Sequence, residues 1–224
     1  MSSESPKHVL FGQFAAVAKA AGHPYRLELL EQLAQGERSV EVLADRLKLS
    51  MANASQHLQH LRRGGLVAAR RDGKFVLYRL ADDAVLDLVA ALRRVAEAQS
   101  AEVERVVRSY FENRDSLEPV TRAELVGRLR DGVVTVLDVR PQDEFALGHL
   151  PGAINVPLAE LEKRLSAFDP GQEIVAYCRG PYCVLSYEAV ARLRARGFKV
   201  RRLEDGYPEW RAAGLPVEAG LTAP

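Results

Sequence analysis

Two apolar runs in the second half of this 224-residue chain constrain its fold more than any other feature. Residues 133–139 are Val-Val-Thr-Val-Leu-Asp-Val, and residues 174–177 are Ile-Val-Ala-Tyr. A nearly continuous apolar run is typical of a strand buried on both faces, as the strands of parallel sheets are. Helical patterns at 121–129 and 186–195 and a further strand at 200–203 alternate with these runs, so we predict an α/β domain with a parallel sheet.

The first half of the chain has a different pattern, in which apolar residues recur every three or four positions. It predicts helices over residues 11–21, 24–34, 40–47 and 51–63, with Ser39 and Ser50 capping the last two. Strand-like runs follow at 66–69 and 75–80, and the Asp72-Gly73 pair between them favours a hairpin turn. We therefore predict a mainly α domain that ends in a hairpin, within a chain long enough for two domains of about 100 residues each.

A longer helical stripe extends from about residue 82 to about residue 111. Its apolar positions are Val85, Leu88, Leu92, Val95, Val103, Val106 and Tyr110, with Gln99 in the same register. This stripe fits either a helix packed on its own domain or a seam between two copies of the chain, and its length favours the seam. The polar break at 113–116 then predicts domains at 1–113 and 117–220.

Between Arg46 and Leu80 the chain carries eight basic residues and one acidic residue, although its overall net charge is only +1. A local charge of this size indicates a polyanion such as DNA. The helices at 40–47 and 51–63 are joined by a short turn, as in a helix-turn-helix, with the basic hairpin as a wing. The residues expected to read bases are Ser50, Asn53, Gln56, His57 and His60, and those expected near phosphates are Arg62, Arg63, Arg70, Arg71 and Lys74. The structural alternative is a solvated polar helix face.

This segment resembles the winged-helix domain of the ArsR/SmtB family of bacterial repressors. The resemblance rests on Leu49-Ser50, on the run Ser55-Gln-His57-Leu58, and on Gly65-Leu66-Val67. It implies a homodimeric repressor that reads an inverted-repeat operator, and it adds Ser55 to the expected DNA-binding residues. Metal-sensing members carry Cys-x-Cys where this chain has Ser39-Val-Glu-Val42, so we expect no metal here. His57 and His60 could be read as ligands, but they lie on the expected DNA face.

The only two cysteines, Cys178 and Cys183, lie in one segment, Cys-Arg-Gly-Pro-Tyr-Cys, between a predicted strand and a predicted helix. An α/β sheet places reactive loops there, beyond the carboxyl end of a strand. The helix N-terminus and the cationic Arg179 would lower the pKa of a cysteine and favour a nucleophilic thiolate. The alternatives are half of a zinc site, with His149 as a further ligand, or two inert core cysteines.

The second half as a whole resembles a single-domain rhodanese. The matching motifs are Leu137-Asp-Val-Arg140, Gly148-His149-Leu-Pro-Gly-Ala153, and Gly206-Tyr-Pro-Glu-Trp210. The resemblance implies a sulfurtransferase-type site in which Cys178 carries a persulfide within a loop that includes Arg179, Gly180 and Tyr182. It gives Asp138, Arg140 and His149 a structural, supporting role.

The loop also departs from the rhodanese pattern. Pro181 has no N–H to offer a bound anion. Cys183 occupies the sixth position, which is commonly cationic or hydroxylic, and would supply a resolving thiol. Neither Cys183 nor Val184 is an arginine, which disfavours the phosphoryl and arsenate chemistry of related loops.

These observations favour a cytoplasmic, homodimeric repressor that binds double-stranded DNA and senses sulfane sulfur through Cys178. The alternative is chiefly a sulfurtransferase that takes sulfur from thiosulfate or a persulfide, with DNA binding for autoregulation or localisation. A third hypothesis is an interaction module with an inactive rhodanese unit. No apolar stretch approaches the length of a membrane span, so we expect no membrane partner, and we expect no cofactor.

Overall fold

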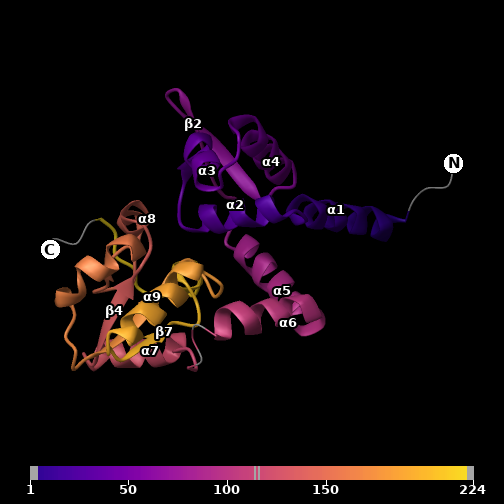
Figure 1. Ribbon diagram of the computed structural model, residues 1–224. Coiled ribbons are helices and arrows are strands. Elements are labelled where there is room, and N and C mark those ends of the chain that lie inside the picture. The colour runs from indigo at the N-terminus through magenta and orange to yellow at the C-terminus, as the bar shows by residue number, and fades with distance from the viewer. Residues whose placement is uncertain (1–4, 114, 116, 221–224) are drawn as a thin grey trace. The chain divides into compact units, whose positions relative to one another are not determined.

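The computed structural model describes residues 5–113, 115 and 117–220, and the chain forms two compact units, Met1–Leu92 and Arg93–Pro224 (Figure 1). Their order along the chain confirms the predicted architecture, a winged helix followed by an α/β domain. Among the helices of the described residues, none is long and apolar enough to cross a membrane.

The first unit is a small helical bundle with a three-stranded sheet. Its helices are α1 (Pro6–Ala21), α2 (Pro24–Ala34), α3 (Val40–Arg46) and α4 (Met51–Arg63). Ser39 Oγ accepts from Val42 N and Ser50 Oγ accepts from Asn53 N, so both predicted caps are confirmed. The shared core includes fully buried leucines from α2, α3 and α4: Leu29, Leu43, Leu58 and Leu61.

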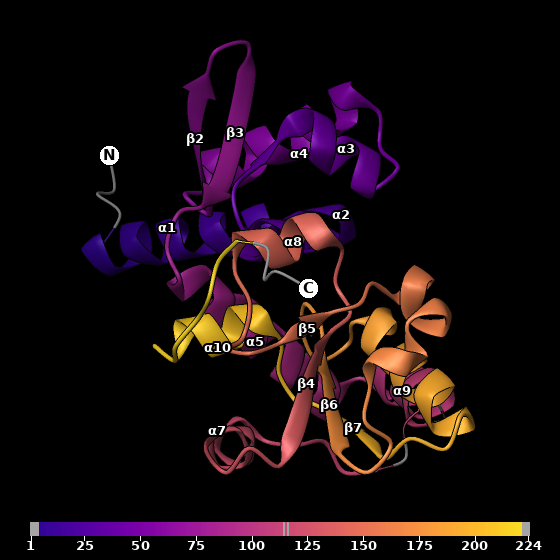
Figure 2. The same ribbon diagram turned by 90° about the vertical axis from the view of Figure 1, so that its left-hand side faces the viewer.

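The predicted hairpin is formed by β2 (Val67–Asp72) and β3 (Phe75–Leu80), which pair antiparallel (Figure 2). Gly73 in its turn has φ +58°, a left-handed conformation that glycine adopts without strain. A short strand that the sequence pattern does not indicate, β1 (Arg38–Ser39), pairs with the other edge of β3. The hairpin is thereby joined to the segment between α2 and α3.

The long helix predicted over 82–111 is not continuous. It consists of α5 (Ala84–Gln99), α6 (Ala101–Val106) and a π-helical turn, η1 (Val107–Glu112). Ser100 interrupts it with extended dihedral angles (φ −107°, ψ 108°), and its Oγ accepts from Val103 N at 3.3 Å. The Ser100 side chain accepts from a backbone N–H that would donate to a backbone carbonyl if the helix were continuous. Ser100 therefore ends α5 and caps α6.

The boundary between units also differs from the expected break at 113–116. Residues 93–113 belong to the second unit, where the ring of Phe111 lies 4.8 Å from that of Tyr187. Residues 114 and 116 of the expected break lie outside the described residues. α5 therefore starts in one unit and ends in the other.

The second unit is built on a parallel sheet with strand order β5-β4-β6-β7 (Figure 2). The strands are β4 (Val134–Asp138), β5 (Ile154–Asn155), β6 (Glu173–Tyr177) and β7 (Val200–Arg202). The helices are α7 (Arg122–Arg130), α8 (Gln142–Leu147), α9 (Val184–Ala195) and α10 (Tyr207–Ala212), with 3-10 turns at η2 (Leu158–Lys163) and η3 (Leu165–Ala167). The α/β prediction is confirmed.

Side chains of the central strands alternate between two hydrophobic clusters, one on each face of this sheet. Ile174 and Ala176 pack with α9, whereas Val175 and Tyr177 pack with residues of α7 and α10. Burial on both faces explains why these strands are continuously apolar in sequence. The same packing fixes the carboxyl end of β6, where the cysteine loop begins.

Candidate functional sites

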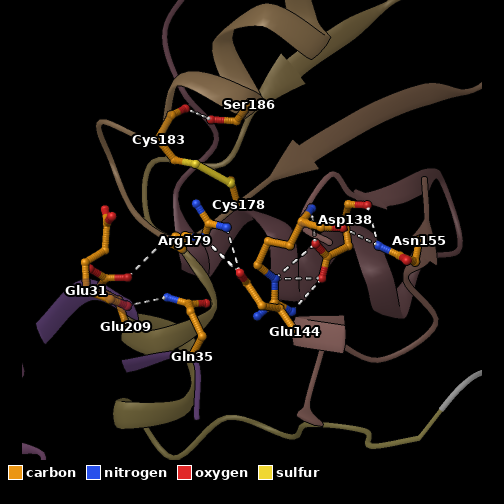
Figure 3. Close-up of a disulfide and its surroundings, with 12 residues drawn as sticks. Glu31, Gln35, Asp138, Glu144, Asn155, Cys178, Arg179, Cys183, Ser186 and Glu209 are labelled. Atoms are coloured by element: carbon orange, nitrogen blue, oxygen red, sulfur yellow. Dashed lines mark hydrogen bonds and ion pairs between the residues drawn. A yellow bond between two sulfur atoms is a disulfide. The ribbon is translucent and has the colours of Figure 1, made fainter. Parts of the chain in front are cut away.

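The two cysteines close a six-residue loop between β6 and α9 (Figure 3). Cys178 follows Tyr177, the last residue of β6, and Cys183 is the N-cap residue of α9. Their sulfur atoms form a disulfide, and their Cα atoms are 6.1 Å apart, within the range that a disulfide can bridge. The loop therefore brings the two predicted reactive thiols into direct contact.

Backbone contacts hold this loop in place. Cys183 N donates to Gly180 O at 3.1 Å, and Tyr207 N donates to Cys178 O at 3.1 Å. A Cβ atom at Gly206 would lie 2.4 Å from the carbonyl carbon of Arg179 and from the nitrogen of Gly180, so only glycine allows this approach. The segment Gly206-Tyr-Pro-Glu-Trp210 thus packs against the loop and hydrogen-bonds to it.

Both cysteines are shielded from solvent. Cys178 is 1% exposed and Cys183 is 7% exposed, and both join the hydrophobic cluster that includes α9. The loop offers fewer anion-binding amides than its length implies, because Pro181 has no N–H and the Cys183 N–H already bonds within the loop. The two sulfur atoms are therefore surrounded chiefly by closely packed apolar side chains.

Arg179, the expected cationic neighbour, is paired with a buried carboxylate (Figure 3). Its Nε donates to Glu144 Oε2 at 2.9 Å and its Nη2 donates to Oε1 at 2.7 Å. Glu144 is fully buried, and a bidentate pair of this kind neutralises most of the charge of the guanidinium. Arg179 therefore offers less positive charge to a neighbouring sulfur atom than the sequence indicates. Glu144 is a site residue that sequence reasoning missed.

Asp138 and Arg140 form a buried ion pair beside the loop. Arg140 N and Nε donate to the Asp138 carboxylate at 2.9 and 3.0 Å, and Nη2 donates to it at 2.6 Å and to Gly148 O at 2.8 Å. Burial opposes the charged form of Arg140, but Asp138 outweighs this and raises its pKa. His149 lies nearby with its ring stacked on Phe145 at 3.6 Å between centroids. All three side chains are buried, and their supporting role stays a prediction.

Tyr182 projects from the loop toward α5. Its hydroxyl donates to Glu97 Oε1 at 2.7 Å, and its ring lies 5.1 Å from that of Phe111. The sequence offers no signal for this contact, because 85 positions separate its two residues. Gly180, the remaining loop residue named from the sequence, is buried against Gly206.

In the first unit, most of the expected base readers lie on the solvent side of α4. Gln56 and His60 are exposed, and Asn53 and Ser55 are half-buried. Ser50 is exposed, but its Oγ also accepts the cap hydrogen bond from Asn53 N. Arg62 at the end of α4 and Arg71 and Lys74 in the hairpin are exposed as well.

His57 differs from its expected position. It is half-buried, and its ring lies 4.5 Å from that of His23 and 5.8 Å from that of Tyr25, at the start of α2. Its Nδ1 is buried and has no hydrogen-bond partner among the described residues. The imidazole thus packs against the start of α2, and burial, followed by His23, Arg26 and His60, lowers the pKa of His57.

A basic groove of about 660 Å³ lies between α4 and the hairpin. Arg62, Arg63 and Arg71 line it, and among the described residues no carboxylate pairs with any of them. Arg70 also lines it but is already paired, since its Nε and Nη2 donate to Glu37 at 3.0 and 2.5 Å. Three arginines are thus available to a polyanion, and the fourth is held by an acid.

Histidine, cysteine and carboxylate side chains do not gather as a metal site anywhere in the described residues. The two units thus offer different chemistry. One presents cations and short polar side chains on a helix and hairpin, and the other presents two sulfur atoms in a buried loop.

Comparison with known proteins assigns both units. A rhodanese-like domain model matches residues 121–213, and a helix-turn-helix domain model matches residues 21–70. The chain is 45% identical over 214 residues to the HTH-type transcriptional regulator Rv0324 of Mycobacterium tuberculosis, covering 96% of this chain and 94% of that protein. A protein named sulfurtransferase from Allochromatium vinosum is 33% identical over 87 residues, covering 38% of this chain and 79% of that protein.

Among solved structures, the homodimeric winged helix-turn-helix DNA-binding domain Mb0332 (fragment 1–100) from Mycobacterium bovis is similar to this chain, with 41% identity and a TM-score of 0.41. The match covers 46% of this chain and 95% of that one.

Proposed function

The chain belongs to the HTH-type transcriptional regulators that join an ArsR-type winged helix to a rhodanese-like domain, and on this premise we propose that it is a repressor that responds to sulfane sulfur through Cys178. The observation that carries the proposal is the pairing of the only two cysteines of the chain within one buried loop at the carboxyl end of β6. Such a pair can exist as a dithiol, as a persulfide or as a disulfide, which gives a sensor chemically distinct states.

The proposed reaction has two steps. The Cys178 thiolate attacks the sulfane sulfur of a persulfide or polysulfide, and this sulfur becomes the terminal atom on Cys178. A persulfide donor leaves as a thiolate, and a polysulfide donor leaves as a polysulfide that is one sulfur shorter. The Cys183 thiolate then attacks Cys178 Sγ, the bond to the terminal sulfur breaks, and hydrosulfide leaves. The two thiols lose two electrons to form the disulfide, and the sulfane sulfur gains them as sulfide.

On the DNA side, the proposal is a cytoplasmic homodimer that binds an inverted repeat in double-stranded DNA. The exposed apolar residues Leu10, Phe11 and Phe14 on α1 support self-association, because large apolar side chains on one helix face favour a protein partner. Gln56 and His60 remain the proposed base readers, and Arg62, Arg71 and Lys74 the proposed phosphate contacts.

The test is the affinity of the full chain for a DNA duplex that it selects from a random library, measured before and after treatment with disodium tetrasulfide. We expect a change of at least about tenfold in wild type and none in Cys178→Ser. Equal affinities of the two wild-type forms would contradict the sensing proposal. Ser186, whose hydroxyl donates to Cys183 O, offers a loop control as Ser186→Ala, since it leaves both thiols intact.

The second candidate function is a sulfurtransferase, which the 33% identical relative of that name favours for the second unit. Repeated formation of thiocyanate from thiosulfate and cyanide, lost in Cys178→Ala, would favour this function. Stoichiometric sulfur loading without turnover would favour the sensor.

A further inference from the structure

The hydroxyl of Tyr182 connects the cysteine loop to helix α5. Tyr182 precedes Cys183 in the loop, and its hydrogen bond of 2.7 Å ends on Oε1 of Glu97, close to the C-terminal end of α5. Burial, followed by this hydrogen bond, raises the pKa of Tyr182 to about 12. The hydroxyl therefore remains a hydrogen-bond donor throughout the physiological pH range.

A cavity adjoins the same contact. It measures about 680 Å³ and is bounded by Pro181 and Tyr182 of the loop, by Phe111, and by Glu97. Close-packed interiors leave little freedom to a large side chain, so a cavity of this size gives the Tyr182 ring room to change position.

α5 also provides a covalent route from Glu97 to the winged-helix unit. The N-terminal part of this helix contributes Val85, Leu86, Leu88 and Val89 to the hydrophobic cluster of that unit. The helix is continuous from Ala84 to Gln99, so a shift near one end is transmitted to the other.

Changes in the chemical state of the loop have to move it. Cys178 is almost completely buried, so a terminal sulfur atom added to it lacks space unless the loop shifts. Reduction of the disulfide removes the covalent closure between Cys178 and Cys183, and with it the constraint on the residues between them. Tyr182 is one of those residues.

We propose that Glu97 is a positioning residue that reports the state of the cysteine loop to the DNA-binding unit through its hydrogen bond with Tyr182. The bond fixes the end of α5 in the disulfide form and is lost in the dithiol and persulfide forms. Glu97 then keeps only its i,i+4 pair with Arg93, at 3.5 Å, which lies within α5 and makes no link to the loop. The inference rests on the proposed function and adds the route by which it is regulated.

The test uses the full chain in two prepared states. Dithiothreitol supplies two electrons and two protons to give the dithiol form and becomes a cyclic disulfide. Tetrasulfide accepts two electrons from the two thiols to give the disulfide form, and it is converted to trisulfide and hydrosulfide. Mass spectrometry checks the state, and the measured quantity is the ratio of the two dissociation constants for the selected duplex. The variants are Tyr182→Phe, Glu97→Ala and Glu97→Gln. Glu102→Gln is a matched control, because Glu102 is exposed and, among the residues that the structure describes, pairs with Arg105 alone.

A hydrogen bond to a charged group can bias an equilibrium about tenfold or more. We expect the ratio to approach one in Tyr182→Phe and Glu97→Ala while the disulfide still forms, and to remain near the wild-type value in Glu102→Gln. Glu97→Gln keeps an acceptor oxygen, so its ratio of dissociation constants should stay closer to the wild-type value than to one. A purely structural role of Glu97 would not produce this rescue. An unchanged ratio in Tyr182→Phe overturns the inference and leaves the sensing proposal intact. A wild-type ratio of one overturns the sensing proposal itself.

Discussion

The pairing of Arg70 with Glu37 leads to a specific prediction about DNA binding. Replacing Glu37 with glutamine removes the carboxylate that accepts hydrogen bonds from Arg70 Nε and Nη2. The Arg70 side chain is about half exposed. Arg70 Nη1 also pairs with Asp72 Oδ2 at 3.2 Å, but the Nε and Nη2 edge is released by the substitution. Arg70 lines the same basic groove as Arg62 and Arg71, so this edge can reach a phosphate there. We therefore expect Glu37→Gln to bind DNA more tightly than wild type.

The magnitude follows from counterion release. Each phosphate contact adds about 0.9 to the slope of log affinity against log salt concentration, so one new contact changes the affinity ratio between 50 and 200 mM salt by about 3.5-fold. Arg71→Ala should reduce the slope by about the same amount, because no acid neutralises Arg71 among the described residues. Arg70→Ala alone should have little effect, since Glu37 already holds that charge.

The assay is fluorescence anisotropy with a duplex of fixed sequence at four or more salt concentrations. Glu28→Gln is the control, because Glu28 is exposed on α2 and its loss changes the net charge equally. Adding Arg70→Ala to Glu37→Gln should abolish the gain. The reasoning is refuted if Glu37→Gln and Glu28→Gln have the same slope, or if Arg70→Ala alone lowers the slope as much as Arg71→Ala does.

Three further predictions concern stability and sulfur chemistry. Asp138→Asn removes the carboxylate that binds the fully buried Arg140 and should cost about 3–5 kcal/mol in urea unfolding, with partial recovery on adding Arg140→Met; a cost below about 1 kcal/mol would contradict the buried-pair argument. Because the pKa of His57 is lowered in the folded protein, the unfolded chain binds more protons near pH 6, so the free energy of unfolding should fall as the pH drops below about 6.5; an equal fall in His57→Gln would argue against this residue as the source. Cys183→Ser should stop the reaction at the persulfide, seen as a stable gain of about 32 Da on Cys178 after tetrasulfide treatment, whereas no gain in mass at Cys178 would contradict the proposed first step.

The elements that follow from local patterns could be predicted from the sequence. The apolar runs at 133–139 and 174–177 are β4 and β6, and the Asp72-Gly73 turn joins β2 to β3, because burial on two faces and a left-handed turn each leave a local signature. Ser100 marks the limit of this reasoning. The apolar stripe continues through it with helical spacing, yet its side chain caps a new helix, and the stripe gives no sign of that competition.

The site divides in the same way, between what a segment determines alone and what distant segments determine together. The loop position of Cys178 and Cys183 follows from the strand and helix on either side, so it could be predicted. The pairing of Arg179 could not, because its partner Glu144 lies 35 positions away in sequence. His57 looks outward on a helical projection of α4 alone and turns inward only because His23 and Tyr25 at the start of α2 lie against it. For this chain, then, the spacing of polar residues along one helix or loop identifies the side chains that could bind a ligand. A partner from another element then decides whether the charge of such a side chain is compensated and whether a ligand can reach it.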